Sequence, residues 1–278
     1  MPELPEVETM VRGLRSRIKN KRIIDVWTDE RKLFYHPSFS VLKKKIKDSS
    51  IMDVRRRGKI IVFHLKPQGF LLFHPKMTGH FLILSPKTYQ KEYIEDKSIH
   101  AFFELNNNQY LAWSDQRKFS RIEYWPTETI EDIKWLANLG DEPLVADFTF
   151  ERFNELIDQN SARIKSWLMD QKHIVGIGNI YANEILWATK INPYRQAKSL
   201  SLSERKKIFS GIKKILKQAI IEGGTSIAEF RNVNDQEGKY SSYLKIYRKN
   251  GKCPRCHQSL KREIIGNRST YYCPYCQK

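Results

Sequence analysis

The cysteines impose the tightest constraint on how this chain folds, because all four lie within its last 26 residues. They form two Cys-x-x-Cys pairs, Cys253 with Cys256 and Cys273 with Cys276, and sixteen residues separate the pairs. A disulfide scaffold would spread its cysteines through a small secreted chain, and a redox dithiol needs only one pair. Two such turns can offer four thiolates to one tetrahedral ion. The spacing therefore predicts one structural Zn²⁺ whose closed ligand shell leaves no position for a substrate.

The segment between the two pairs carries a hairpin signal. Two β-like runs, 263–265 and 269–272, flank Gly266-Asn267, a dipeptide typical of type I′ turns. Arg268 follows at the tip, where its cation is placed to enter a DNA groove or to contact a phosphate. A solvated surface arginine is the plainer alternative, and for Arg268 alone it is the better supported one. A further β-like run at 243–247 is expected to lead into this segment.

The apolar pattern divides the rest of the chain into a β-rich part and a helical part. Residues 2–19 predict a helix with one apolar face, because apolar residues recur there at spacings of three and four. These residues are Leu4, Val7, Val11, Leu14 and Ile18. From about 22 to 125, short β-like runs separated by turn signals predict a β-sandwich. The runs are 22–27, 59–65, 70–73, 80–84, 100–105, 110–113 and 120–125.

From about residue 130 the pattern becomes helical. The segments 150–157, 162–168, 179–189 and 202–221 predict helices. The last of them starts with a capping box, Ser201-x-x-Glu204, and stops at Gly223-Gly224. The stretch 225–242 is polar with little apolar periodicity, so we expect a mobile loop there.

The charge of the chain indicates a polyanionic partner. Lys and Arg number 49 against 31 Asp and Glu, which leaves a net charge of +18 spread over 278 residues. Nucleic acid is the commonest polyanion, and a merely soluble basic surface is the weaker alternative. No apolar run approaches the length of a membrane span, and no stretch near Met1 resembles a signal peptide. We therefore expect a cytoplasmic protein without a membrane partner.

The chain opens with Met1-Pro2-Glu3-Leu4-Pro5-Glu6. Removal of Met1 would leave Pro2 with a free secondary amine, which can attack an aldehyde-like carbon and form an iminium. An α-amino group has a pKa near ~8, so an appreciable fraction is neutral at pH 7. The alternative is that Pro2 and Pro5 only start a helix, and these six residues alone favour it.

Four other segments carry weaker signals. The turn Val175-Gly176-Ile177-Gly178 precedes a helix, where backbone N–H groups can bind phosphate, with Arg163 and Lys165 just upstream. The basic run at 55–59 is either a solvated face or part of a site. Met77 and Phe119 lie in turn-like segments and are either core residues or wedges that fill the gap left by a flipped nucleotide.

These features occur together and in order, and the chain resembles the bacterial formamidopyrimidine-DNA glycosylase family, which repairs oxidised purines in DNA. The resemblance extends over nearly the full length. The matching motifs are Pro2 to Thr9, Arg56-Arg57-Gly58-Lys59, Lys76-Met77-Thr78-Gly79-His80, Trp167 to Gln171, Gly176 to Ala182, and the zinc segment.

The resemblance implies catalytic roles for five residues. Pro2 matches the nucleophile that attacks C1′ and forms a Schiff base, and Glu3 matches the acid that protonates the opened sugar. Glu6 would shape the same pocket. Lys59 matches the hairpin lysine that donates a proton in β-elimination and contacts phosphate. Arg268 matches the zinc-hairpin arginine linked to δ-elimination and to phosphate binding.

The resemblance also implies how DNA is held. Met77, Arg117 and Phe119 match residues that fill the void in the duplex and face the orphan cytosine. Three further residues match phosphate-contacting positions: His100, Lys165 and Asn179. The implied partner is damaged double-stranded DNA, bound by a monomer that associates with the bacterial nucleoid through its substrate.

The implied fold is α+β and multidomain. It comprises an N-terminal β-sandwich with a leading helix (1–130), a helix–two-turn–helix domain that includes the 225–242 loop (131–242), and a zinc finger (243–278). The implied function is a glycosylase and abasic-site lyase for oxidised purines, cutting by β,δ-elimination. The sister enzyme class for oxidised pyrimidines, in which glycine tends to replace Leu4, is one alternative. A non-catalytic zinc-ribbon nucleic-acid binder is the other.

The chain departs from the family pattern at the turn that carries Phe119. The family commonly shows Asp-Pro-Arg-Arg-Phe-Gly, whereas this chain has Gln116 for the proline, Lys118 for the second arginine and Ser120 for the glycine. Ser269 also stands where glycine is usual after Arg268. We expect these changes to leave the wedge intact and to affect the rigidity of the turn and the preference for the opposite base.

Overall fold

The computed structural model describes residues 2–89, 96–158, 160–227, 230–247 and 251–278. The chain divides into two compact units: residues 1–138 with 223–238, and residues 139–222 with 239–278. The expected domain division placed all of 225–242 with the helical part, whereas the structure groups 223–238 with the sheets. The reason is contact: Ile83 N–H donates to the Val233 carbonyl (3.3 Å), and Phe230 and Val233 join the sheet core.

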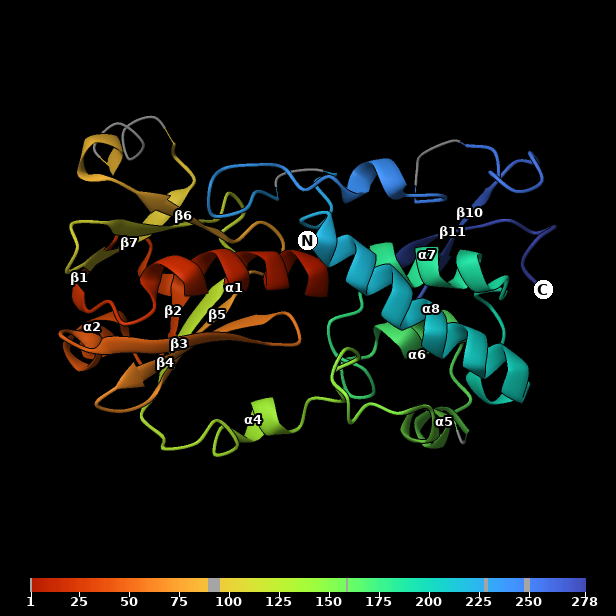
Figure 1. Ribbon diagram of the computed structural model, residues 1–278, viewed down its shortest axis with the longest axis horizontal. Coiled ribbons are helices and arrows are strands. Elements are labelled where there is room, and N and C mark those ends of the chain that lie inside the picture. Colours follow the sequence, from red (N-terminus) through yellow and green to blue (C-terminus); the bar gives the residue numbers. More distant parts are fainter. Residues whose placement is uncertain (1, 90–95, 159, 228–229, 248–250) are drawn as a thin grey trace. The chain divides into compact units, whose positions relative to one another are not determined.

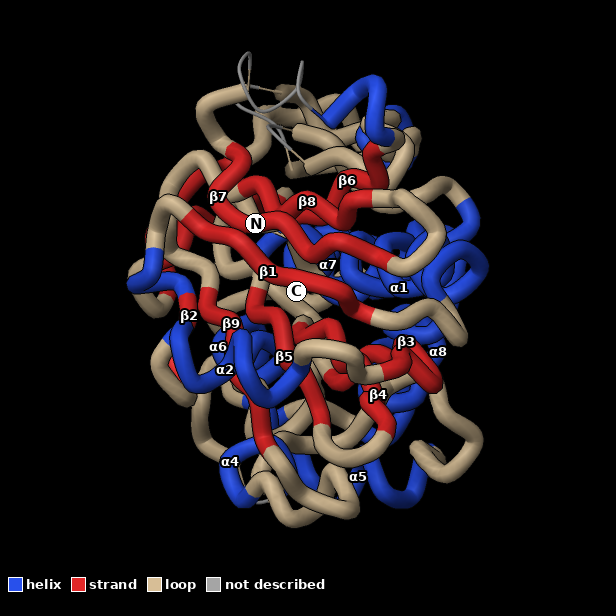
Figure 2. Tube along the Cα trace, turned by 90° about the vertical axis from the view of Figure 1, so that its left-hand side faces the viewer, coloured by secondary structure: helices blue, strands red, loops and turns tan. Residues whose placement is uncertain are grey.

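The first unit contains two antiparallel-rich sheets that face each other (Figure 2). One sheet has the order β1-β7-β8-β6, and the other has the order β2-β9-β5-β4-β3. The first comprises β1 (Ile23–Thr28), β6 (His80–Leu84), β7 (Ile99–Leu105) and β8 (Tyr110–Ser114). The second comprises β2 (Phe34–His36), β3 (Ser50–Arg57), β4 (Ile60–Lys66), β5 (Phe70–His74) and β9 (Arg121–Trp125). The predicted β-sandwich is confirmed.

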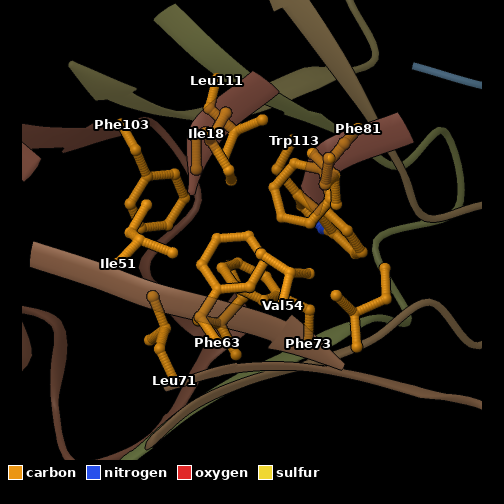
Figure 3. Packing of buried hydrophobic residues seen from close by; sticks show 14 of the residues in the cluster. Ile18, Ile51, Val54, Phe63, Leu71, Phe73, Phe81, Phe103, Leu111 and Trp113 are labelled. Atoms are coloured by element: carbon orange, nitrogen blue, oxygen red, sulfur yellow. The ribbon is translucent and has the colours of Figure 1, made fainter. Parts of the chain in front are cut away.

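An aromatic cluster fills the space between the two sheets (Figure 3). The Phe73 ring lies 4.6 Å from that of Phe81, 5.0 Å from that of Phe63 and 5.3 Å from that of Trp113, measured between centroids. All four side chains are fully buried. Truncating one such ring to alanine typically costs about 3–5 kcal/mol, which is a large fraction of the stability of a domain.

Helix α1 (Leu4–Ile18) leads into this unit and runs along the β3–β4 hairpin (Figure 1). The apolar face expected from the sequence is buried at every one of its five positions. The helix begins at Leu4 rather than at residue 2, because Glu3 is its N-cap. The described part of this unit also contains two short helices, α2 (Phe39–Ile46) and α4 (Lys134–Ala137).

The second unit is helical and ends in a β-hairpin. Its helices are α5 (Phe150–Asp158), α6 (Ile164–Met169), α7 (Asn179–Thr189) and α8 (Leu202–Ile221). The hairpin pairs β10 (Lys261–Ile265) with β11 (Arg268–Tyr272). The predicted capping box of α8 is present, with the Ser201 hydroxyl accepting from Glu204 N–H and the Glu204 carboxylate from Ser201 N–H. No helix among the described residues could cross a membrane.

One predicted element is wrong. Residues 243–247 form no strand; a short 3₁₀ helix occupies Tyr240–Tyr243, and irregular backbone follows. The physical reason is that the backbone N–H groups of Lys245, Ile246 and Tyr247 all donate to the carboxylate of Glu184. Those donors are therefore not available to a strand partner. Of the loop expected to be mobile, residues 228–229 lie outside the described part, and its mobility stays a prediction.

An ion-pair cluster joins α1 to β3. Arg15 donates to both oxygens of Asp53 (2.8 and 3.1 Å), and Arg55 donates to one of them (2.7 Å). Burial would raise the pKa of Asp53, but the hydrogen bonds from Arg15 and Arg55 outweigh it and lower the pKa from 3.8 to about 2. A depressed pKa in the folded state contributes stability above pH 3.8, and that contribution is lost as the pH falls through about 2.

We expect Asp53→Asn to lower the thermal midpoint by roughly 1–4 °C at pH 7, the scale of a partly exposed ion pair. The difference from the wild type should shrink as the pH falls from 4 towards 2, where the wild-type carboxylate becomes protonated. Circular dichroism melts across this range measure it. Asp48→Asn is the matched control, since Asp48 is exposed. A difference that stays constant with pH would contradict the role of the Asp53 charge.

Candidate functional site

The N-terminus of α1 brings three predicted catalytic residues together. Pro2, Glu3 and Glu6 are all buried. Glu3 and Glu6 form a reciprocal capping box, in which Glu3 N–H donates to Glu6 Oε2 (2.8 Å) and the Glu3 side chain accepts from the Glu6 backbone. Two carboxyl groups therefore lie beside the Pro2 backbone in a region shielded from water. Met1 lies outside the described residues.

The second oxygen of Glu6 binds a distant segment of the same unit. Thr225 N–H donates to Glu6 Oε1 (2.7 Å). Gly224 adopts a left-handed conformation (φ +82°), and a Cβ at that position would lie 3.0 Å from both Cγ and Oε1 of Glu6. The sequence showed Gly223-Gly224 only as a helix stop, and it carried no signal for this contact. The structure shows that Gly224 also permits the close approach to Glu6.

Lys59 lies in the tight turn between β3 and β4, half-buried, after Gly58 (φ 56°). Arg56 fixes this turn to α1, because it donates to Glu8 Oε2 (3.0 Å) and to the Gly58 carbonyl (3.1 Å). Burial raises the pKa of Glu8, but the effect of Arg12 and Arg56 is larger. The net result is a lowered pKa, which keeps the carboxylate charged. The basic run at 55–59 is therefore partly structural, because Arg56 positions the turn that carries Lys59.

Two neighbouring turns carry the predicted void-filling residues. Met77 lies half-buried in the turn between β5 and β6, and Arg117 and Phe119 are exposed in the turn between β8 and β9. Phe119 is 53% exposed, so it is not a core residue. The Arg117 guanidinium lies 4.8 Å from the centre of the Phe119 ring. His100 stands apart from them in β7, buried, with Nδ1 3.0 Å from Asp29 Oδ1.

In the second unit, Lys165 and Asn179 meet the zinc hairpin. Lys165 is fully buried, and its Nζ donates to Asn179 Oδ1 (2.7 Å), Thr270 Oγ1 (2.8 Å) and the Ser269 carbonyl (3.1 Å). Asn179 Nδ2 donates to the same Ser269 carbonyl (3.0 Å). A buried ammonium needs such partners to offset its lost hydration. The lysine therefore bonds the start of α6 to the N-terminus of α7 and to β11.

The hairpin has the turn that its sequence predicted. Gly266 and Asn267 both have positive φ (54° and 59°), as a type I′ turn requires. A Cβ on Gly266 would lie 3.3 Å from Ser166 Oγ, so the turn lies against α6. Arg268 is exposed at the start of β11, beside the Ser269 carbonyl that Lys165 and Asn179 share.

The four cysteines form a site that fits one Zn²⁺. Their sulfur atoms all lie within 4.8 Å of one another, with 3.4 Å between Cys256 and Cys273 and 3.8 Å between Cys253 and Cys276. Tetrahedral zinc with Zn–S bonds of about 2.3 Å requires sulfur separations of this size. Four thiolates complete the coordination, so the ion is structural.

Glu184 is a buried structural carboxylate of this unit that the sequence analysis missed. It lies almost fully buried in α7, and its carboxylate accepts the N–H groups of Lys245 (2.9 Å), Ile246 (3.0 Å) and Tyr247 (2.9 Å). Burial raises the pKa of Glu184, and the three backbone hydrogen bonds act against that rise. The only signal in the sequence was a single carboxylate within an apolar helical stretch. Glu184 holds the segment that leads from the 3₁₀ helix towards the zinc site.

Comparison with known protein families matches three models along the chain. Residues 1–122 match the formamidopyrimidine-DNA glycosylase N-terminal domain, and residues 139–231 match its H2TH domain. Residues 251–278 match a zinc finger found in formamidopyrimidine-DNA glycosylases and isoleucyl-tRNA synthetases. A relative named formamidopyrimidine-DNA glycosylase from Pelotomaculum thermopropionicum is 37% identical, and the alignment covers 100% of this chain and 99% of that protein.

Solved structures of similar fold contain DNA. Wild-type Lactococcus lactis Fpg in complex with DNA containing N7-benzyl-Fapy-dG has a TM-score of 0.90 at 30% identity, with complete coverage of both chains. The same protein in complex with DNA containing an oxidised pyrimidine has a TM-score of 0.89 at 29% identity, also with complete coverage. On these matches, which span the sheet unit, the helical unit and the zinc finger, the chain belongs to the formamidopyrimidine-DNA glycosylase family.

Proposed function

We propose that this protein is a DNA glycosylase with abasic-site lyase activity that acts as a monomer on oxidised purines in duplex DNA. The observation that carries the proposal is the buried N-terminus of α1, where Pro2 precedes two carboxyl groups held by a capping box. A chain terminus usually frays. Here Pro2 and Glu3 are buried beside the start of α1, a position that would hold a nucleophile in place.

In the proposed chemistry the Pro2 nitrogen attacks C1′ of the damaged nucleotide with its lone pair. The base leaves with the electrons of the glycosidic bond and takes up the proton that the Pro2 nitrogen releases. Glu3 donates a proton to the ring oxygen, so the sugar opens to an iminium at C1′. The iminium acidifies the C2′ protons, and loss of one expels the 3′ phosphate. A second elimination expels the 5′ phosphate. Water then hydrolyses the iminium and releases the amine.

The remaining residues would bind and orient DNA. Lys59, on a turn fixed by Arg56, donates a proton during β-elimination and contacts a phosphate. Arg268 is exposed and is proposed to contact phosphate and to assist δ-elimination. Because Lys165 is fully buried, we propose that it positions Asn179 and the Arg268 turn rather than reaching phosphate itself. His100 in β7 keeps a small exposed fraction (3%, against 0% for Lys165), and it is proposed to contact phosphate.

Met77, Arg117 and Phe119 are proposed to fill the space that the flipped nucleotide leaves. Flipping costs a few kcal/mol, and less for a damaged pair. The exposed Phe119 ring with the Arg117 guanidinium over it offers an apolar surface and hydrogen-bond donors to the orphan base. The net charge of +18 makes binding of the duplex strongly dependent on salt.

Oxidised pyrimidines are a second candidate substrate class. The observation that favours them is that L. lactis Fpg, a similar structure, is known in complex with DNA containing an oxidised pyrimidine. Leu4, where the sister class tends to have glycine, favours the purine substrates.

Borohydride trapping tests the nucleophile. We expect the wild type, incubated with an 8-oxoguanine duplex and borohydride, to form a covalent adduct on the peptide that begins at Pro2, as located by mass spectrometry. Pro2→Gly should trap at least about tenfold more slowly, because a flexible primary amine replaces a fixed secondary one.

An added alanine between Met1 and Pro2 is the matched control, since it acylates the Pro2 nitrogen and removes its lone pair. An adduct on a lysine, or equal trapping by Pro2→Gly, would show that the nucleophile is another residue. A non-catalytic zinc-ribbon binder would bind the duplex without an adduct and without a nick.

Excision rates on two duplexes separate the substrate classes. We expect single-turnover excision of 8-oxoguanine to be at least about tenfold faster than excision of thymine glycol in the same sequence context, a difference of about 1.4 kcal/mol in the barrier. An undamaged duplex is the control. Faster removal of thymine glycol would assign the protein to the pyrimidine-repair class.

Removal of zinc should weaken the binding of DNA by the second unit. Small zinc sites fold only with their metal, so metal loss would unfold the hairpin. Because the hairpin supplies Ser269 and Thr270 to Lys165, the buried ammonium would then lose two of its acceptors. We expect Cys253→Ser to lose bound zinc and to weaken binding of a duplex with a stable abasic analogue by at least about tenfold. Metal content and fluorescence anisotropy measure the two effects. Loss of zinc with an unchanged affinity for the duplex would show that the zinc finger does not contribute to DNA binding.

A further inference from the structure

The two turns that carry Met77, Arg117 and Phe119 share one buried hydrogen-bond network. The first turn joins β5 to β6, and the second joins β8 to β9. Thr78 lies in the first turn, and Asp115 and Ser120 lie at the two ends of the second. Their exposed fractions are 8%, 0% and 3%. All three side chains are therefore too buried to contact DNA themselves. Each lies next to or near one of the proposed DNA-facing residues: half-buried Met77, or exposed Arg117 and Phe119.

Asp115 is the centre of this network. One carboxylate oxygen accepts a short hydrogen bond from the Thr78 hydroxyl, and the other accepts Ser120 N–H at 2.8 Å. The Asp115 carbonyl accepts Lys118 N–H at 3.0 Å. The carboxylate therefore closes the second turn on itself and ties it to the first.

The Thr78 hydroxyl completes the connection in the opposite direction. While it donates to Asp115, it accepts the backbone N–H of Arg117 at 3.1 Å. A single oxygen atom thus bonds to both the start and the middle of the second turn. Thr78 directly follows Met77, so the positions of Met77 and Arg117 are coupled through one side chain.

Ser120 adds an anchor to the core. Its hydroxyl accepts the indole N–H of Trp113 at 2.8 Å. Trp113 is fully buried and packs edge-on against Phe81, with ring centroids 4.6 Å apart. A Cβ on Gly79 would lie 2.6 Å from Trp113 Cζ2, so the indole also supports the first turn. A glycine at position 120 could not accept this bond, and Gln116 leaves the turn without the stiffness of a proline.

We propose that Thr78, Asp115 and Ser120 are positioning residues that hold Met77, Arg117 and Phe119 in one arrangement and thereby set the preference for the base opposite the lesion. The inference rests on the proposed function, because it assumes that these three side chains face the orphan base. Buried hydrogen bonds replace the local stiffness that a proline would provide. A network confined to supporting the fold would affect all substrates alike.

Thr78→Val tests the proposal, since it keeps the shape of the side chain and removes the hydroxyl. The measurement is single-turnover excision of 8-oxoguanine opposite cytosine and opposite adenine. We expect the ratio of the two rates to move towards one by about tenfold, the scale of a broken buried hydrogen-bond network. Thr78→Ser retains the hydroxyl and should keep the ratio within about twofold of the wild type.

Thr127→Val is the matched control, because the half-buried Thr127 donates its hydroxyl to the nearby Thr129 carbonyl and lies outside both turns. Ser120→Ala, which removes only the Trp113 anchor, provides a second variant if Thr78→Val does not fold, and it should shift the ratio in the same direction. Equal loss of both rates, with the ratio preserved in Thr78→Val and Ser120→Ala, would overturn the proposal. Failure of Thr78→Ser to restore the ratio would overturn it as well.

A binding measurement keeps this inference distinct from the proposed chemistry. The affinity for a duplex that contains a tetrahydrofuran site opposite cytosine or adenine requires no excision. If the wild type binds with a preference for one opposite base but excises nothing, the proposed glycosylase chemistry is contradicted. The positioning role is then tested by whether Thr78→Val removes that binding preference. If the wild type excises but Thr78→Val retains both ratios, only the positioning role fails.

Discussion

The carboxylate of Glu6 is the interaction on which the proposed catalytic end of the molecule depends. One oxygen accepts the N–H of Glu3, and the other accepts the N–H of Thr225. A carboxylate at a helix N-terminus is favoured by the unpaired backbone donors and by the helix dipole. In this protein the same group also orders the residues before the helix. Pro2 and Glu3, which precede the helix, are thereby held in buried positions of the first unit.

Buried charges organise the second unit in a related way. Lys165 and Glu184 are both largely removed from water, and each is surrounded by partners from several segments. Burying an ion is costly unless its hydrogen bonds are satisfied, so moving any of those segments away would leave a buried charge without a partner. Lys165 bonds the zinc hairpin to α6 and α7, and Glu184 fixes the path of residues 245–247. Neither residue contributes through hydrophobic packing alone.

The elements that the sequence predicted well are those with local signals. The buried face of α1, the bounds of α7 and α8, the I′ turn and the cysteine cluster each follow from periodicity, capping or spacing. Helix α2 was not identified, because only Leu42 and Ile46 are buried within its eight residues. Residues 243–247 were predicted to be a strand because the competing acceptor, Glu184, is distant in sequence. For the same reason the sequence pointed to Lys165 as a phosphate contact and gave no sign that it is buried.

The hydrogen bond between Glu6 and Thr225 spans 219 positions of the chain. A ribosome that has synthesised the whole β-sandwich has not yet supplied this partner. A contact of helix α1 is thus completed only after most of the chain has been synthesised, and a chain released before residue 225 would lack the hydrogen bond to Glu6 Oε1. The surroundings of the proposed nucleophile, Pro2, therefore reach their final form only after residues 139–222 of the second unit have also been synthesised.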